Sequence, residues 1–277
     1  MLYKEYRTEK EEMTMIAFRT GAVWDLILLL VLSATSYYYM NKALKGEELP
    51  KIRTLAAIEA MEEGVGRSVE ADKPVHFAMG ASGGQLYSTL VSMTLTGLAM
   101  ANYVARLCAK LNARLIVHMP GQAESIPAVE GQVREGYLRE GKPEMFIRED
   151  MRYYGRQASS WTQGVTSSYA EEGVGVNISV GIFYSDCPIS LELAKFHGGM
   201  NIGGTGRWIM AYAFAMMCDY VLLGEEIYAG AAQVSENPLM LSGIAIEEIG
   251  KAFVYGMIAL GLILSVLGVS AATTFGF

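Results

Sequence analysis

The segment 80–84 (GASGG) holds the residues whose types and spacing best fit a chemical task. It matches the pattern G-x-S-x-G, with the apolar run 75–79 before it and a helical pattern after it. A serine at such a strand-to-helix turn is the arrangement of a nucleophile elbow. Asp186 and His197 follow Ser82 in the chain order that a serine, acid and histidine triad takes in that setting. Ser82, Asp186 and His197 are therefore the catalytic candidates.

Two features of the pattern argue against such a triad. The elbow would follow the first strand of the domain instead of a central one, and His197 comes only eleven positions after Asp186. The simpler interpretation of segment 80–84 is a tight glycine turn that lets the following helix pack onto the sheet.

Glycine-rich segments at strand ends also suggest ligand binding. Glycines allow the backbone to approach a phosphate closely, and the N-terminus of a following helix adds exposed amides. The chain contains neither G-x-G-x-x-G nor G-x-x-x-x-G-K-[ST], so no particular cofactor is indicated. The ligand-binding candidates are Gly80, Ser82, Gly83, Gly84, Gly203, Gly204, Thr205 and Arg207.

A divalent metal is a third option. Glu225 and Glu226 follow a short apolar run and could bind a metal together with Asp186 or His118. The alternative is that two carboxylates in the first turn of a helix are stabilised by its dipole. No metal site is predicted on this basis.

These residues must be positioned by alternating strands and helices, which predict a parallel sheet covered on both faces. The fold class is therefore α/β, with a Rossmann-like or flavodoxin-like, doubly wound sheet. The apolar run 208–223 is an alternative membrane segment, but Asp219 and the strand-like Tyr-Val-Leu-Leu argue against it. The expected strands are 75–79, 115–119, 151–154, 176–184 and 220–223, and the expected helices 49–70, 86–107, 124–140, 159–172 and 189–197.

The composition points to membrane segments outside this domain. Hydrophobic residues make up 52% of the 277 residues, charged residues 18%, and the mean hydropathy is +0.25. Long apolar runs predict transmembrane helices at 21–41 and 251–277. A polar segment (1–20) precedes the first, a juxtamembrane helix (42–73) follows it, and the Rossmann-like domain spans 74–250.

The distribution of charges and cysteines indicates where the protein is located and which kinds of partner it binds. A net charge of −7 without a basic block argues against nucleic-acid binding. Basic residues lie slightly more often beside the middle domain, which predicts a two-span protein of the cell membrane with a cytoplasmic α/β domain. Three scattered cysteines agree with a reducing compartment. Small residues four apart in segment 251–277, together with an apolar domain of low charge, predict homo-oligomers, or a larger membrane complex, packed through membrane helices and domain sides. The alternative is that glycine is simply common in membrane helices.

Four segments carry a resemblance to a known family. PVHFAMG (74–80), VGVNISVGIF (174–183), GGMNIGGTG (198–206) and DYVLLGEEIYAGA (219–231) are similar to an uncharacterised prokaryotic family. The resemblance implies a Rossmann-like domain of unknown function between an N-terminal and a C-terminal span. It implies no activity and assigns no role to Ser82.

The expected function is a homo-oligomeric scaffold or ligand-sensing module that presents an α/β domain at the cytoplasmic face of the lipid bilayer. The alternative is a membrane-anchored hydrolase, or a nucleotide- or metal-dependent enzyme, that uses the strand-end loops.

Overall fold

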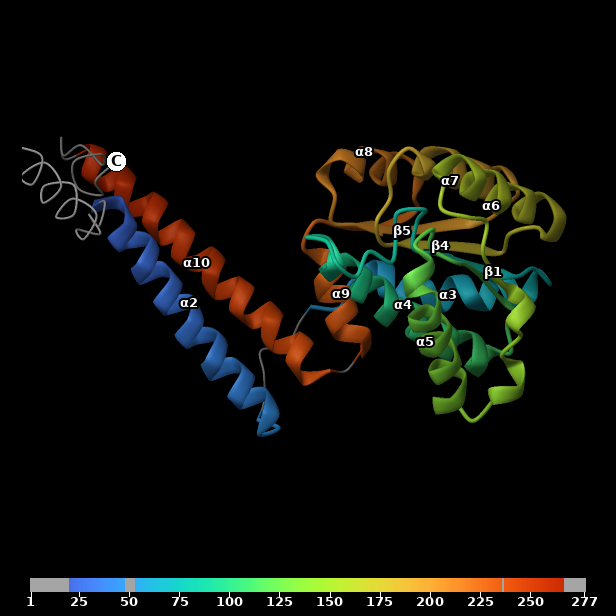
Figure 1. Ribbon diagram of the computed structural model, residues 1–277, viewed down its shortest axis with the longest axis horizontal. Helices are drawn as coiled ribbons and strands as arrows, with labels where there is room; N and C mark the ends of the chain where they lie inside the picture. The colour runs from blue at the N-terminus through green and yellow to red at the C-terminus, as the bar shows by residue number, and fades with distance from the viewer. Residues whose placement is uncertain (1–19, 48–52, 236, 267–277) are drawn as a thin grey trace, which may run out of the picture. The chain divides into compact units, whose positions relative to one another are not determined.

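The computed structural model describes residues 20–47, 53–235 and 237–266 (Figure 1). The chain divides into two compact units. One comprises residues 51–241, and the other combines the described parts of 1–50 and 242–277.

The larger unit is built on a six-stranded parallel sheet with the order β3-β2-β1-β4-β5-β6 (Figure 1). This order is that of a doubly wound Rossmann-like sheet, in which the winding reverses between β1 and β4. The predicted α/β, Rossmann-like fold is thus confirmed. The strands are β1 Val75–Ala78, β2 Leu115–His118, β3 Met151–Arg152, β4 Val176–Val180, β5 Met200–Thr205 and β6 Tyr220–Leu223.

Helices cover both faces of this sheet (Figure 1). One layer contains α3 (Ala56–Glu70), α4 (Val91–Leu111), α5 (Ile126–Arg139) and α9 (Glu226–Ser235). The other contains α6 (Ala158–Glu172), α7 (Asp186–Phe196) and α8 (Trp208–Met217). Every residue of β1, β2 and β4 is buried, as expected for strands covered on both sides. Short 3₁₀ turns occur at Ala123–Ser125, Pro143–Met145 and Arg148–Asp150.

Strand β5 was not predicted, because its sequence, Met-Asn-Ile-Gly-Gly-Thr, is typical of a loop. Its glycines serve helix packing instead. A Cβ at Gly203 would lie 2.3 Å from the Phe214 ring and 2.5 Å from Cys218 Sγ, so α8 rests directly on the strand backbone. The predicted glycine loop at 203–206 is therefore wrong for Gly203, Gly204 and Thr205, which belong to the strand.

Two predicted boundaries also differ. The predicted strand 176–184 ends at Val180, because Gly181, with φ 152°, is followed by a loop that turns toward β1. The helix expected from residue 86 begins at Val91, so six residues separate it from Gly84. The glycine turn therefore does not lead directly into a helix N-terminus.

Helix α3 belongs to the α/β unit. A Cβ at Gly64 would lie 2.6 Å from Met200 Cε and 2.8 Å from Val176 Cγ2, so α3 packs closely against the sheet. Most of the segment predicted as juxtamembrane thus contributes to the core through residues such as Met61 and Val65.

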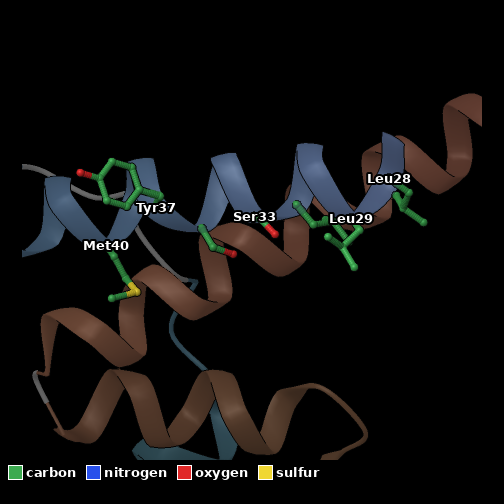
Figure 2. Close-up of a pocket in the computed structure, with 7 residues that line it drawn as sticks. Leu28, Leu29, Ser33, Tyr37 and Met40 are labelled. Carbon is green, nitrogen blue, oxygen red and sulfur yellow. The ribbon is translucent and has the colours of Figure 1, made fainter. Parts of the chain in front are cut away.

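The smaller unit contains α2 (Thr20–Leu44) and most of α10 (Pro238–Val266). No helix within the described residues combines the length and apolar character needed to cross a membrane. The two predicted spans thus gain no support from the structure, and residues 267–277 of the second lie outside the described residues. A groove of about 660 Å³ runs along one side of α2, and Figure 2 draws the side chains that line it. It is lined by Leu28, Leu29, Leu32, Ser33, Ser36, Tyr37 and Met40.

Candidate functional site

The carboxyl ends of β1 and β4 form the switch point at which Rossmann-like sheets bind ligands. Here the two loops touch each other through their backbones. The Ile182 N–H donates to the Met79 carbonyl at 3.1 Å, and a Cβ at Gly80 would lie 2.1 Å from the Ile182 carbonyl oxygen. Gly80 also has φ 84°, which favours glycine. Gly80 is thus explained by close loop packing.

Asp186 ties these two loops together. Its Oδ2 accepts a hydrogen bond from the Ala81 N–H at 2.9 Å, and its Oδ1 accepts one from the Tyr184 N–H at 2.7 Å. The side chain is buried and begins α7, where the helix dipole favours a negative charge. The Asp186 carboxylate therefore already accepts the hydrogen bond of the Ala81 N–H. In other folds of this type, an anionic ligand would bind such a loop amide.

Ser82, Asp186 and His197 do not form a triad. Ser82 is half-buried beside Ala81 at the carboxyl edge of the sheet. His197 follows the last residue of α7, and its carbonyl accepts a hydrogen bond from Lys73 Nζ, just before β1. The 11 residues of α7 span about 16 Å and carry His197 to the amino edge of the sheet. His197 is thus too far from Ser82 to act as its base.

The remaining ligand candidates also serve internal contacts. Thr205 Oγ1 donates to the Gly181 carbonyl at 3.2 Å and accepts from the Arg207 N–H at 3.2 Å. The Arg207 guanidinium stacks on the Tyr184 ring, 3.8 Å from its centroid, and donates to the Tyr184 hydroxyl. Among the described residues, Arg207 Nε has no hydrogen-bond partner.

The proposed metal ligands do not converge. Glu226 lies 3.6 Å from the Arg53 guanidinium and is half-exposed, while Asp186 binds the loop amides. His118 is buried in a different part of the sheet. The described part of the chain holds no group of three side chains that could bind a metal ion.

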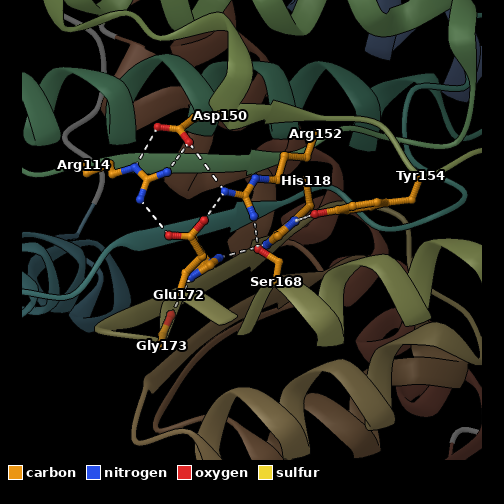
Figure 3. Close-up of polar contacts among 9 residues, drawn as sticks. Arg114, His118, Asp150, Arg152, Tyr154, Ser168, Glu172 and Gly173 are labelled. Carbon is orange, nitrogen blue, oxygen red and sulfur yellow. Dashed lines mark hydrogen bonds and ion pairs between the residues drawn. The ribbon is translucent and has the colours of Figure 1, made fainter. Parts of the chain in front are cut away.

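Hydrogen-bonded polar side chains form a network inside the larger unit (Figure 3). His76 Nδ1 lies 3.0 Å from His118 Nε2, His76 Nε2 lies 2.9 Å from the Gly173 carbonyl oxygen, and His118 Nδ1 lies 3.2 Å from the Tyr154 hydroxyl. The Gly173 carbonyl can only accept a hydrogen bond, and this determines which nitrogen of each imidazole carries the proton. His76 donates from Nε2 to Gly173, His118 donates from Nε2 to His76, and Tyr154 donates to His118.

A second group of hydrogen-bonded polar side chains lies on the neighbouring strands. Asn177 and Asn201 occupy the same row as His76 in the strand register. Asn177 Oδ1 accepts from the Tyr169 hydroxyl at 3.0 Å, and Asn177 Nδ2 donates to Asn201 Oδ1 at 3.0 Å. Polar residues at matching positions of three strands were the signal that sequence reasoning missed.

The electrostatics keep both imidazoles neutral. Burial lowers the pKa of His76 to about 4, against a smaller opposing effect from the Gly173 hydrogen bond. The pKa of His118 lies well below its usual range. Burial is the largest cause, and the neighbouring His76 and Arg152 lower it further. Burial also raises the pKa of the Tyr169 hydroxyl.

An ion-pair cluster lies beside the imidazoles (Figure 3). Arg114 binds both oxygens of Asp150, at 2.9 and 2.7 Å, and one oxygen of Glu172 at 2.7 Å. Arg152 binds Glu172 and the Ser168 hydroxyl. Hydrogen bonds from Arg152 and then Arg114 hold the pKa of Glu172 below its usual value. Two cations face two anions, so the cluster is balanced and fixes α6 to the β2–β3 side of the sheet.

Comparisons with known proteins identify a family and no activity. No curated protein and no solved structure matches the chain. Residues 13–275 match a family described as a domain of unknown function, DUF6754. Because this match covers nearly the whole sequence, the chain belongs to the DUF6754 family.

Proposed function

We propose that this protein is a self-assembling scaffold at a membrane, and that its α/β unit binds other proteins rather than catalysing a reaction. The proposal is carried by the outer face of α8. Trp208, Tyr212 and Met216 lie four residues apart on that helix and are 84%, 56% and 70% exposed. Residues four apart share one side of a helix, so they form a continuous apolar stripe.

The composition of this stripe favours a protein partner. Helix α8 carries no charged residue, and four of its exposed side chains are large: Trp208, Ile209, Tyr212 and Met216. Trp, Tyr and Met are enriched at protein interfaces, and Trp and Tyr contribute a large part of the binding energy there. Exposed apolar stripes of this kind on a folded domain mark interaction surfaces.

The strand-end loops also favour a binding role over catalysis, because their polar groups already bind other residues of the protein. Asp186 already uses the switch-point amide at Ala81, and the buried histidines already have partners. An enzyme would need an accessible nucleophile or acid–base pair at this edge. Asp186 and Thr205 form internal hydrogen bonds instead, and Gly80 and Gly203 allow close packing.

Assembly is expected to depend on the α8 stripe. The double variant Tyr212→Glu/Met216→Glu should weaken self-association by roughly tenfold or more, because it places two charges in the proposed interface. Mass measurement of the full chain in mild detergent at several protein concentrations checks this. Leu138→Glu is the matched control, because Leu138 is 52% exposed on α5, in the opposite layer. A monomeric wild-type protein, or equal weakening by the control, would contradict the proposal.

Membrane association is the second part of the proposal. It rests on the hydropathy of segments 21–41 and 251–277 and on exposed apolar side chains such as Leu29, Leu30 and Ile263. It does not rest on a spanning helix in the described residues. The positive-inside bias of the sequence favours a cytoplasmic α/β unit.

The full chain is expected to float with uncharged phosphatidylcholine vesicles, and 1 M salt should not release it, because apolar contacts are not screened by salt. The variant Leu29→Asn/Leu30→Asn should bind less, whereas Leu138→Glu should bind like the wild type. Sedimentation of wild-type protein away from the vesicles would exclude this part of the proposal.

A further inference from the structure

A cleft of about 450 Å³ lies on α4, between α5 and the turn that joins α9 to α10. Its floor is a row of α4 residues at helical spacing, namely Leu95, Leu98, Ala99 and Asn102. Side chains of α5 form one wall, and residues of the α9–α10 turn form the other. All of these residues belong to the α/β unit, and the volume is in the range of small-molecule sites.

Asn102 is the polar group that indicates a ligand, because it is only 9% exposed and half of its amide is unpaired. Its Nδ2 donates to the Gln132 carbonyl at 2.9 Å, whereas its Oδ1 makes no hydrogen bond within the described part of the chain. That oxygen is not enclosed by the protein, and Asn102 lines the cleft, so Oδ1 faces the cleft. An unpaired acceptor in so buried a residue favours an occupant that carries an N–H or O–H group.

Most of the surface around Asn102 in the cleft is apolar. Leu95 is 51% exposed, and Leu98, Ala99 and Met240 add apolar surface to the lining. Water alone would satisfy Asn102 Oδ1 but would leave this surface hydrated, whereas an apolar ligand would remove it from water. A methionine sulfur also makes favourable contacts with aromatic rings. The cleft therefore suits a molecule with an apolar ring system.

The charges that line the cleft compensate each other. Glu135 and Arg139 lie one turn apart on α5, and Glu135 Oε1 accepts from Arg139 Nε at 2.9 Å and from Arg139 Nη2 at 2.6 Å. These two are the charged residues among the described residues that line the cleft. Because they form an ion pair with each other, the cleft favours an uncharged ligand over an anion or an amine.

We propose that this cleft binds a small uncharged molecule with an apolar ring and an N–H or O–H group that donates to Asn102 Oδ1. The cleft lies in the helix layer opposite α8, so this inference does not depend on the self-assembly proposed above. A ligand there contacts α5 and also Met240 in the first turn of α10, so it joins the two walls of the cleft.

Indole and indene are a matched pair of probes, because indene has the same bicyclic shape but a CH₂ group in place of the N–H. Equilibrium dialysis of the full chain in mild detergent, with detergent alone as the reference, measures the saturable binding of each probe. The wild type should bind indole roughly fivefold more tightly than indene, as expected for one net hydrogen bond. Asn102→Ala should bind the two probes equally, because it lacks the acceptor.

Two exposed leucines give a second, matched pair of variants. Leu95→Glu places a charge in the cleft and should abolish saturable indole binding. Leu138→Glu, at a residue 52% exposed on α5 but outside the cleft, should bind indole like the wild type. Because Leu95 is about equally exposed, this comparison tests the site even if Asn102→Ala does not fold. A wild type without saturable indole binding, undiminished binding by Leu95→Glu, or equal affinity of the wild type for both probes would overturn the proposal.

Discussion

Replacing Asp186 by alanine is expected to lower the free energy of unfolding by about 3 to 5 kcal/mol. The carboxylate accepts hydrogen bonds from the Ala81 and Tyr184 amides and is 1% exposed. Its removal leaves both buried donors without a partner, and each loss costs about 1–3 kcal/mol. Urea unfolding of the full chain, followed by the fluorescence of the buried Trp161, measures this change.

Two companion variants separate the hydrogen bonds from other effects of the change. Asp186→Asn keeps one acceptor oxygen and should lose about half as much stability. Glu192→Ala removes an exposed acid from the same helix and should change stability by less than about 0.5 kcal/mol. If Asp186→Ala were as stable as Glu192→Ala, Asp186 would not hold the two loops together, and the switch point would be open to a ligand.

The fold was predictable because its strands are short apolar runs separated by helices of ordinary length. The runs around Phe77, Val117 and Ile178 lie within β1, β2 and β4, and alternation of strands and helices leaves few topologies besides a doubly wound sheet. Strand β5 was missed because Gly203 and Gly204 look like a loop, although close contact with α8 requires small residues there.

The candidate site was less predictable because it depends on contacts between distant segments. Sequence reasoning selected Asp186 as a catalytic acid, whereas its place at the start of α7 makes it a bridge between two loops. His197 was attractive by chain order, yet the length of α7 separates it from Ser82. The pairing of His76 with His118 depends on the strand register, which a single sequence does not define.

The histidine pair should make the protein unstable toward mild acid. Both imidazoles have pKa values below the 6.5 of an unfolded histidine, so the unfolded chain binds more protons as the pH falls below about 6.5. Stability is therefore highest above that pH and declines toward pH 4, the approximate pKa of His76 in the folded protein. His76 alone should account for about 3 kcal/mol of this loss. With His118 the slope approaches about 2.7 kcal/mol per pH unit.

The window between about pH 4.5 and 6.5 separates the titration of the histidine pair from that of Glu172. The pKa of Glu172 is held below 4.5, so its contribution to stability is present above that value and is lost only at lower pH. Urea unfolding at several pH values within the window measures the slope.

The double variant His76→Leu/His118→Phe should flatten the slope, because it removes both titrating groups. Its stability at pH 7 should stay within about 2 kcal/mol of the wild type, since replacing both partners of a buried hydrogen bond by apolar groups is nearly neutral. His118→Phe alone should be less stable than the double variant, because it leaves His76 Nδ1 buried without a donor. A double variant that kept the full acid dependence would show that other groups titrate in this window and that the pair is not the acid-sensitive element of the fold.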